Sequence, residues 1–239
     1  MLSGWCRTSD REVLAAIVFV TTSGCTWQQL PAASFGPSGA TAHRRFSEWT
    51  KARVWPSSTA WSSTSSAPEA SWTGPLRDRL RQHAGPDKGD LTGANPVDRG
   101  KFGSKIHLIT ERTGLPPVRR NLGGESARQS GTRTPRAWHP AHRSRRGRRR
   151  RKPAKPHADG YDCAHLRKWL RRRGIKHRIA RNGVESSQRL GRHRWTIERT
   201  MAWLAGCRRL HRHYERKAEH FPAFTSIACT LICYRRLAK

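Results

Sequence analysis

Acidic residues are scarce in this chain, which has 16 Asp and Glu against 48 Lys and Arg and a formal net charge of +32. A balance this positive makes a polyanion the natural partner, and nucleic acid is the first candidate. Long hydrophobic runs are also missing, because the apolar stretch from Val13 to Val20 falls far short of the roughly 20 residues that a membrane span requires. We therefore expect no membrane segment and a cytoplasmic protein.

The cysteines do not form a framework. They stand at positions 6, 25, 163, 207, 229 and 233, without Cys-x-x-Cys pairs or the tight spacing of a disulfide scaffold. Cys229 and Cys233 lie one turn apart in an apolar helical pattern, which predicts reduced core residues. No histidine stands at ligand spacing from a cysteine, so a zinc site is not expected. The hydrophobic fraction of 35% indicates that part of the chain does not pack.

Residues 1–55 are predicted to form a small all-helical domain. Ser9 and Glu12 have the spacing of a capping box, and an apolar face then runs to a stop near Gly24. A short second helix is expected over residues 26–30.

A third helix of this domain should begin after Ser38 and bury Ala42, Phe46 and Trp49 on one face. Its basic outer positions suit a DNA-binding accessory domain. A small bundle that only packs on the rest of the protein is an equally open alternative.

Two central segments lack the period of a helix or a strand. Residues 56–90 are rich in Ser, Thr, Pro and Ala, and residues 117–142 in Arg, Pro, Ser and Gly, so we expect both to be poorly structured. Between them, residues 104–110 alternate as a strand should, and a turn follows at residues 114–116.

The C-terminal part, within a predicted domain spanning residues 91–239, reads as alternating elements. Helices are expected at residues 163–173, 192–206 and 219–237, with a short strand at residues 175–180. This succession favours an α/β core.

Asp159 and Glu198 are the candidate catalytic and metal-binding residues. Asp159 lies where a short apolar stretch ends in a turn, and Glu198 lies in the middle of a predicted helix. A hard cation such as Mg²⁺ takes carboxylates and phosphate oxygens as ligands. Spacing alone favours a simpler reading, in which Glu198 pairs with Arg194 one turn earlier and Asp159 only closes a turn.

The densest charge run extends from Arg143 to Lys155. Such a run binds the phosphate backbone without reading sequence, and it is equally compatible with a solvated loop. The candidate DNA-binding residues are Arg145, Arg146, Arg148, Arg149, Arg150, Arg151 and Lys152 in this run, with Arg192 and Arg194 in the helix of Glu198.

Several of these motifs together resemble one family. The chain is similar to bacterial insertion-sequence transposases of the DDE type, in the insertion-sequence-five-like group. The resemblance is carried by Gly24–Pro31, Gly93–Leu108, Arg145–Gly147, Ser186–Leu204, Tyr214–Lys217 and Cys233–Lys239.

This resemblance implies an RNase H-like core in which three acidic residues hold two divalent ions, Mg²⁺ or Mn²⁺, for DNA strand cleavage and joining. Asp159 matches the second acid, Glu198 the third, and Arg194 a family arginine that could contact phosphate. The strand that should carry the first acid falls within residues 56–90, where Asp78 is the candidate. The implied partners are the terminal inverted repeats of the element and target DNA, and a homodimer stays open.

The two aperiodic segments are bracketed by well-matched sequence, which suggests a degraded copy. We hypothesise that compensating frameshifts moved these segments out of the ancestral reading frame, leaving an incomplete core. The sequence then predicts a transposase-like protein that binds DNA but is inactive. The alternative is a basic nucleic-acid-binding protein without catalysis.

Overall fold

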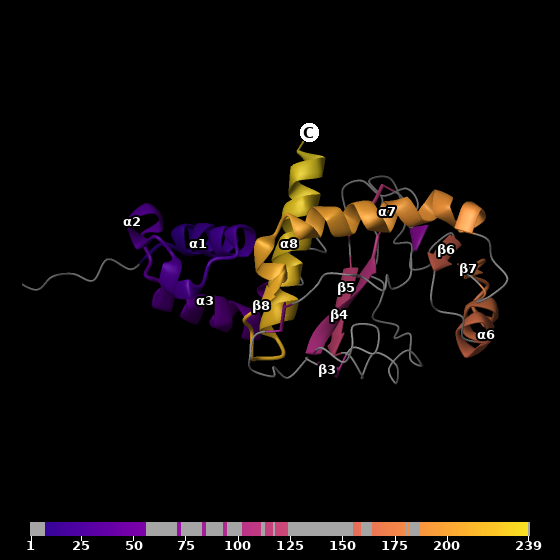
Figure 1. The fold of residues 1–239 in the computed structure, drawn as a ribbon, viewed down its shortest axis with the longest axis horizontal. Coiled ribbons are helices and arrows are strands. Elements are labelled where there is room, and N and C mark those ends of the chain that lie inside the picture. The colour runs from indigo at the N-terminus through magenta and orange to yellow at the C-terminus, as the bar shows by residue number, and fades with distance from the viewer. Residues whose placement is uncertain are drawn as a thin grey trace, which may run out of the picture.

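The computed structural model describes most of the N-terminal and C-terminal parts of the chain and short stretches between them. The described residues are 8–55, 71–72, 83–84, 93–94, 102–110, 113–116, 118–123, 155–158, 164–179, 181 and 187–238. Helices α1 (Asp10–Ser23), α2 (Ala32–Phe35) and α3 (Gly39–Lys51) lie at one end of the molecule (Figure 1). Helix α6 (Ala164–Arg172) lies at the other end with strands β6 (Lys155–Ala158) and β7 (Arg178–Ile179). Helix α8 (His220–Leu237) stands upright between the two ends, and α7 (Ser187–Ala205) extends from it towards the end with α6 (Figure 1).

The N-terminal helices form as their capping residues predict. Helix α1 (Asp10–Ser23) has a capping box, in which the Arg11 N–H donates to the Ser9 hydroxyl and the Ser9 N–H to the Glu12 carboxylate, both at 3.1 Å. It ends at Gly24, whose φ of 74° is left-handed.

The next two predicted helices are also present. The expected short helix is the 3₁₀ turn η1 (Trp27–Gln29), and helix α2 (Ala32–Phe35) adds one turn that the sequence did not predict. In helix α3 (Gly39–Lys51) the Ser38 hydroxyl accepts from the Thr41 N–H at 3.2 Å, which confirms the predicted cap.

The C-terminal half supplies the remaining helices. These are α6 (Ala164–Arg172), α7 (Ser187–Ala205), the 3₁₀ turn η4 (Arg208–Leu210) and α8 (His220–Leu237). Of the apolar residues that repeat along α8, Phe224, Ile227, Ala228 and Ile232 are buried, and Leu231 packs beside them. No helix in the described part of the chain is long and apolar enough to cross a membrane.

The described strands form three small sheets. Strand β6 (Lys155–Ala158) pairs in parallel with both β1 (Ser71–Trp72) and β7 (Arg178–Ile179). Strand β4 (Phe102–Ile109) pairs antiparallel with β3 (Gly93–Ala94) and β5 (Val118–Gly123), and β2 (His83–Ala84) pairs with β8 (Arg212–His213). The strand predicted at residues 104–110 is thus confirmed, and the one at 175–180 is shorter than expected.

Strands β1, β2 and β5 lie inside the segments for which we expected no structure, so that expectation is wrong for those residues. Strand β4 presents a row of backbone donors and acceptors, and these need partners whatever the side chains of the pairing strand are. The apolar pattern used for prediction does not detect pairing of this kind. The rest of residues 56–90 and 117–142 lies outside the described residues.

One apolar core joins the two ends of the chain. Val13, Ile17 and Phe46 from the N-terminal helices are buried in the same cluster as Phe224 and Leu210. The rings of Phe46 and Phe224 stack with centroids 4.4 Å apart. Cys229 and Cys233 are buried free thiols, as predicted. Residues 8–55 therefore share their core with the C-terminal helices.

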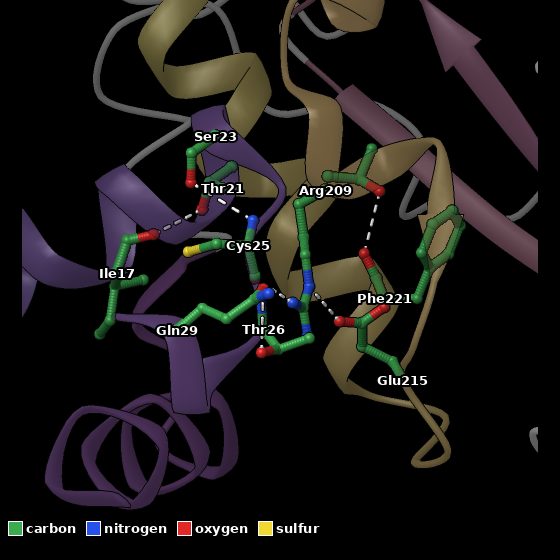
Figure 2. Close-up of polar contacts among 10 residues, drawn as sticks. Ile17, Thr21, Ser23, Cys25, Thr26, Gln29, Arg209, Glu215 and Phe221 are labelled. Atoms are coloured by element: carbon green, nitrogen blue, oxygen red, sulfur yellow. Dashed lines mark hydrogen bonds and ion pairs between the residues drawn. The ribbon is translucent and has the colours of Figure 1, made fainter. Parts of the chain in front are cut away.

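A buried ion pair spans this junction. The Arg209 Nε donates to the Glu215 carboxylate at 2.8 Å, and the two side chains are only 4% and 3% exposed. The Arg209 Nη1 also donates to the Cys25 carbonyl at 2.6 Å, which links η4 to the end of the N-terminal helices (Figure 2). The guanidinium lies 4.6 Å from the Tyr214 ring and 5.2 Å from the Phe224 ring.

Glu215 is incompletely satisfied in this site. Its Oε2 atom is buried and has no hydrogen-bond partner in the part of the chain that the structure describes. Burial raises the pKa of Glu215, and the charge of Arg209 opposes that rise. The pair therefore depends on both members, because either charge alone would be buried without compensation.

Glu215→Gln should lower the free energy of unfolding by roughly 3–5 kcal/mol, because it leaves the Arg209 guanidinium buried and unpaired. The matched control is Arg45→Gln, which breaks the exposed pairs of Arg45 with Asp10 and Glu48 and should cost about 0–1 kcal/mol. Urea unfolding measures both. The double change Arg209→Met with Glu215→Leu should recover most of the loss, and a double variant as unstable as Glu215→Gln would refute the charge argument.

Two histidines meet where α3 packs on α8. The rings of His43 and His220 stand edge to face with centroids 5.7 Å apart, and the His220 Nε2 lies 3.3 Å from the Ser47 hydroxyl. Burial, followed by the charges of His43 and Lys217, lowers the pKa of His220 to about 4, although Glu219 opposes the shift. The pKa of His43 is also lowered, chiefly by burial.

Acid should therefore loosen this junction. The pKa of His220 in the folded protein is about 4, which is below its ordinary value of 6.5. Its contribution to stability is therefore complete above pH 6.5 and is lost as the pH falls towards about 4. Thermal unfolding between pH 7 and pH 4 should show a smaller acid loss for His220→Phe than for the unchanged protein. His177→Asn, after α6, is the control, and an acid loss in His220→Phe equal to that of the control would contradict the assignment.

Candidate catalytic and DNA-contact site

Helix α7 positions Glu198 on its outer face. Residues Ile197, Met201 and Leu204 are buried on the opposite side, where they join the common core. Glu198 itself is exposed. The 3.6-residue period of the helix dictates this split, and it confirms that Glu198 lies in the middle of a helix with its carboxylate towards solvent.

A turn after strand β4 fastens this helix to the sheet. The Thr200 hydroxyl donates to the Gly114 carbonyl at 2.6 Å, and Arg199 donates to the Thr113 carbonyl. Gly114 has a φ of 89°, and a Cβ at this position would lie 3.1 Å from the Thr200 Oγ1. The strand and the helix of Glu198 are thus held close together at a position where only glycine fits without strain.

Arginines and tryptophans alternate along the solvent side of α7. The Arg199 guanidinium lies 4.2 Å from the Trp195 ring and 5.0 Å from the Trp203 ring, and Arg236 from α8 lies 4.3 Å from Trp203. Trp195 is 48% exposed. These cation–π contacts limit the motion of the side chains around Glu198. These contacts were not predicted from the sequence, although Trp195, Arg199 and Trp203 stand at four-residue spacing.

Strand β6 leads directly to Asp159. Its last residue is Ala158, so Asp159 is the next residue in the chain, although Asp159 itself lies outside the described residues. Because β1, β6 and β7 are parallel, their carboxyl ends meet at one edge of the sheet, where sites in such sheets form. The first carboxylate after β1 is Asp78, also outside the described residues.

The predicted DNA-binding residues are placed only in part. Arg192 and Arg194 lie on the first half of α7, one turn or more before Glu198. The basic run lies outside the described residues and comprises Arg145, Arg146, Arg148, Arg149, Arg150, Arg151 and Lys152.

Both ends of the chain match models of known families. Residues 3–58 match a putative transposase of the IS4/5 family, and residues 157–235 match a transposase DDE domain. The putative transposase for insertion sequence element IS402 from Burkholderia cepacia is 39% identical over 150 residues, which cover 62% of this chain and 71% of that protein. The chain belongs to the IS4/5 family of DDE transposases. No solved structure matches it.

Membership in this family confirms the resemblance found in the sequence. A DDE transposase domain implies an RNase H-like core, DNA as the substrate and a divalent metal ion. Among the described residues no group of three His, Cys, Asp or Glu could hold a metal ion. The carboxylates of Asp159 and Glu198 have the oxygen-donor chemistry that Mg²⁺ or Mn²⁺ prefers.

The turn at Gly114 should matter to the stability of the transposase. Gly114→Ala should cost more than Gly174→Ala, because both positions have a positive φ but only Gly114 is crowded. We expect about 1–2 kcal/mol for the left-handed strain alone at Gly174 and a loss at Gly114 larger by about 1 kcal/mol or more. Urea unfolding of the two variants measures the difference, and equal losses would contradict the close docking of the turn on α7.

Proposed function

We propose that this transposase binds DNA and has lost most of its ability to cleave and join strands. The observation that carries the proposal is the asymmetry of two paired strands. Strand β6 runs directly into Asp159, whereas five residues separate the last residue of its parallel neighbour β1 from Asp78. The intervening residues include Gly74 and Pro75, residue types that are unfavourable within a strand. This spacing argues against Asp78 as the first acid, which would complete the set of three with Asp159 and Glu198.

The proposed catalytic residues come from separate elements, as two-metal phosphoryl transfer requires. Ions about 3.5–4 Å apart must clamp the attacking and leaving oxygens, so acids have to converge on them from different directions. Asp159 after β6 and Glu198 on α7 would hold Mg²⁺ or Mn²⁺, and a bound ion would supply charge neutralisation at the phosphate. Without a correctly placed first acid, the chain can bind one ion but cannot hold the pair of ions that contacts both the attacking and the leaving oxygen.

The region between the two family matches supports the idea of a degraded copy. Residues 59–156 lie between the segments matched by the two models, and they contain residues 117–142 and all but the first three residues of 56–90. We propose that compensating frameshifts altered these stretches. Translating the coding sequence in its other two frames checks this, because the idea fails if neither frame restores apolar strand patterns.

The net charge of +32 supports strong DNA binding by the whole chain. The proposed partners are the terminal inverted repeats of the element and target DNA, with the run of arginines from 145 to 151 and Lys152 along the phosphate backbone. A non-catalytic nucleic-acid-binding role is the alternative. A Mn²⁺ titration separates the two, because a catalytic remnant should bind the ion and lose it in Asp159→Ala and Glu198→Ala.

We expect little strand nicking in Mg²⁺ or Mn²⁺, and no further loss in Asp159→Ala, Glu198→Ala or Asp78→Ala. The physical reason is that charge developing in the transition state stays uncompensated when one carboxylate is missing. A supercoiled plasmid assay measures nicking. Robust cleavage that disappears in Asp78→Ala would show an intact set of three acids and overturn the proposal.

A further inference from the structure

The segment around α6 carries an unusual concentration of positive charge. Residues 164–184 contain eight Arg and Lys and no Asp or Glu. The N-terminal helices differ, since residues 8–55 have five Arg and Lys against three Asp and Glu. The charge of this transposase is therefore distributed unevenly over its two ends.

The structure turns this segment into a defined surface. Leu170, Ile175 and Ile179 are buried together, with Trp169 packed against them, so one side of α6 is committed to a small core. The opposite side presents cations to solvent. We call the exposed cations of this segment the α6 surface. They are Lys168, Arg171 and Arg172 on the helix, with Lys176 and Arg181 beyond it.

Two further arginines support this surface. Arg167 donates to the Ile179 carbonyl at 3.2 Å, and the Arg173 guanidinium lies 4.4 Å from the Trp169 ring. Gly174 ends the helix with a φ of 65°, and the Ile175 N–H returns to the Leu170 carbonyl at 3.0 Å. The cations are thus presented by a capped helix with its own apolar contacts.

The cations of the N-terminal helices are in part neutralised. Arg45 lies 3.2 Å from both the Asp10 and the Glu48 carboxylates. Such pairs reduce the charge available to a polyanion. The α6 surface has no acidic residue in its own segment to play this role.

Helix stability explains only a part of the charge. Arg171 and Arg172 stand in the last turn, where cations favour the helix dipole. Lys176 and Arg181 lie beyond the helix, and Lys168 lies in its middle. Like charges crowded on so small a unit repel one another, and a bound polyanion removes that repulsion.

We propose that the α6 surface is a docking site for the phosphate backbone of duplex DNA. The proposal rests on the DNA-binding function proposed above and assigns part of it to one end of the molecule. Helix α6 lies at the end opposite to α1, α2 and α3, on the side towards which the first half of α7 with Arg192 and Arg194 extends (Figure 1). Exposed Arg and Lys contact phosphates without reading bases, so binding at this surface is tolerant of sequence.

The test compares two triple variants of the full chain that remove the same charge. Lys168→Gln, Arg171→Gln and Arg172→Gln alter the α6 surface, whereas Arg11→Gln, Arg44→Gln and Lys51→Gln alter exposed cations of the N-terminal helices. Anisotropy titrations of an unrelated duplex over a series of salt concentrations give the slope of log K against log salt. Each lost phosphate contact makes the slope shallower by about 0.9, so the α6 triple should change it by up to about 2.7 and the control by less than one contact.

Equal slope changes in the two triples would overturn the proposal, because charge would then act only through the net field of the protein. A duplex RNA of the same length is a second arm, and a larger loss for RNA than for DNA in the α6 triple would overturn the assignment to DNA. Far-UV circular dichroism checks that the total helix content of each triple variant equals that of the unchanged chain. Failure of the unchanged chain to bind any duplex would instead refute the proposed function.

Discussion

The ion pair of Arg209 and Glu215 is the contact on which the arrangement of the described helices depends. Among the residues that the structure describes, Arg209 and Glu215 are the only Arg, Lys, Asp or Glu residues that are buried. The desolvation of both charges has to be offset by their contact, by the Cys25 carbonyl and by the surrounding aromatic rings. Because those partners come from both ends of the chain, the pair fixes where η4 meets the N-terminal helices.

From this junction the position of Glu198 follows in two steps. Helix α7 runs into η4 at its C-terminal end, and its buried face contributes Ile197 and Leu204 to the common core. The turn at Gly114 then holds the same helix against strand β4. The outer face is left to charged and aromatic residues. A helix fixed on one face and open on the other is what a metal-binding carboxylate requires, since ion and DNA must approach from solvent.

Local signals allowed the helices to be predicted. The caps at Ser9 and Ser38 and the apolar period of α8 are encoded within a few residues, so α1, α3 and α8 could be identified from the sequence. Contacts between distant residues were missed for the same reason. Nothing near Arg209 indicates Glu215 and Cys25 as joint partners, and nothing within Val118–Gly123 indicates pairing with β4.

For the site, Glu198 was predicted on a helix and is found there, exposed. Asp159 was predicted at the end of a strand, and the strand is present up to Ala158. Asp78, whose flanking residues lack the alternation of a strand, could not be assigned from sequence, and Asp78 and Asp159 remain predictions. The basic run of residues 143–155 is evident in the sequence because charge is a compositional signal, whereas its placement depends on tertiary contacts.

The shared core of the two chain ends has a consequence for how such a gene can decay. With α1 and α3 packed on α8, the stretch from residue 56 to the start of α7 connects two parts that share one core, and the turn at Gly114 within it is docked on α7. The entropy of closing such a loop changes slowly, by only about 0.6 kcal/mol for each doubling of its length. Insertions or deletions in the middle of the chain, away from the turn at Gly114, therefore cost the packed ends little, while loss of either end exposes the apolar surface of the other. A transposase built in this way can lose its chemistry long before it loses its fold.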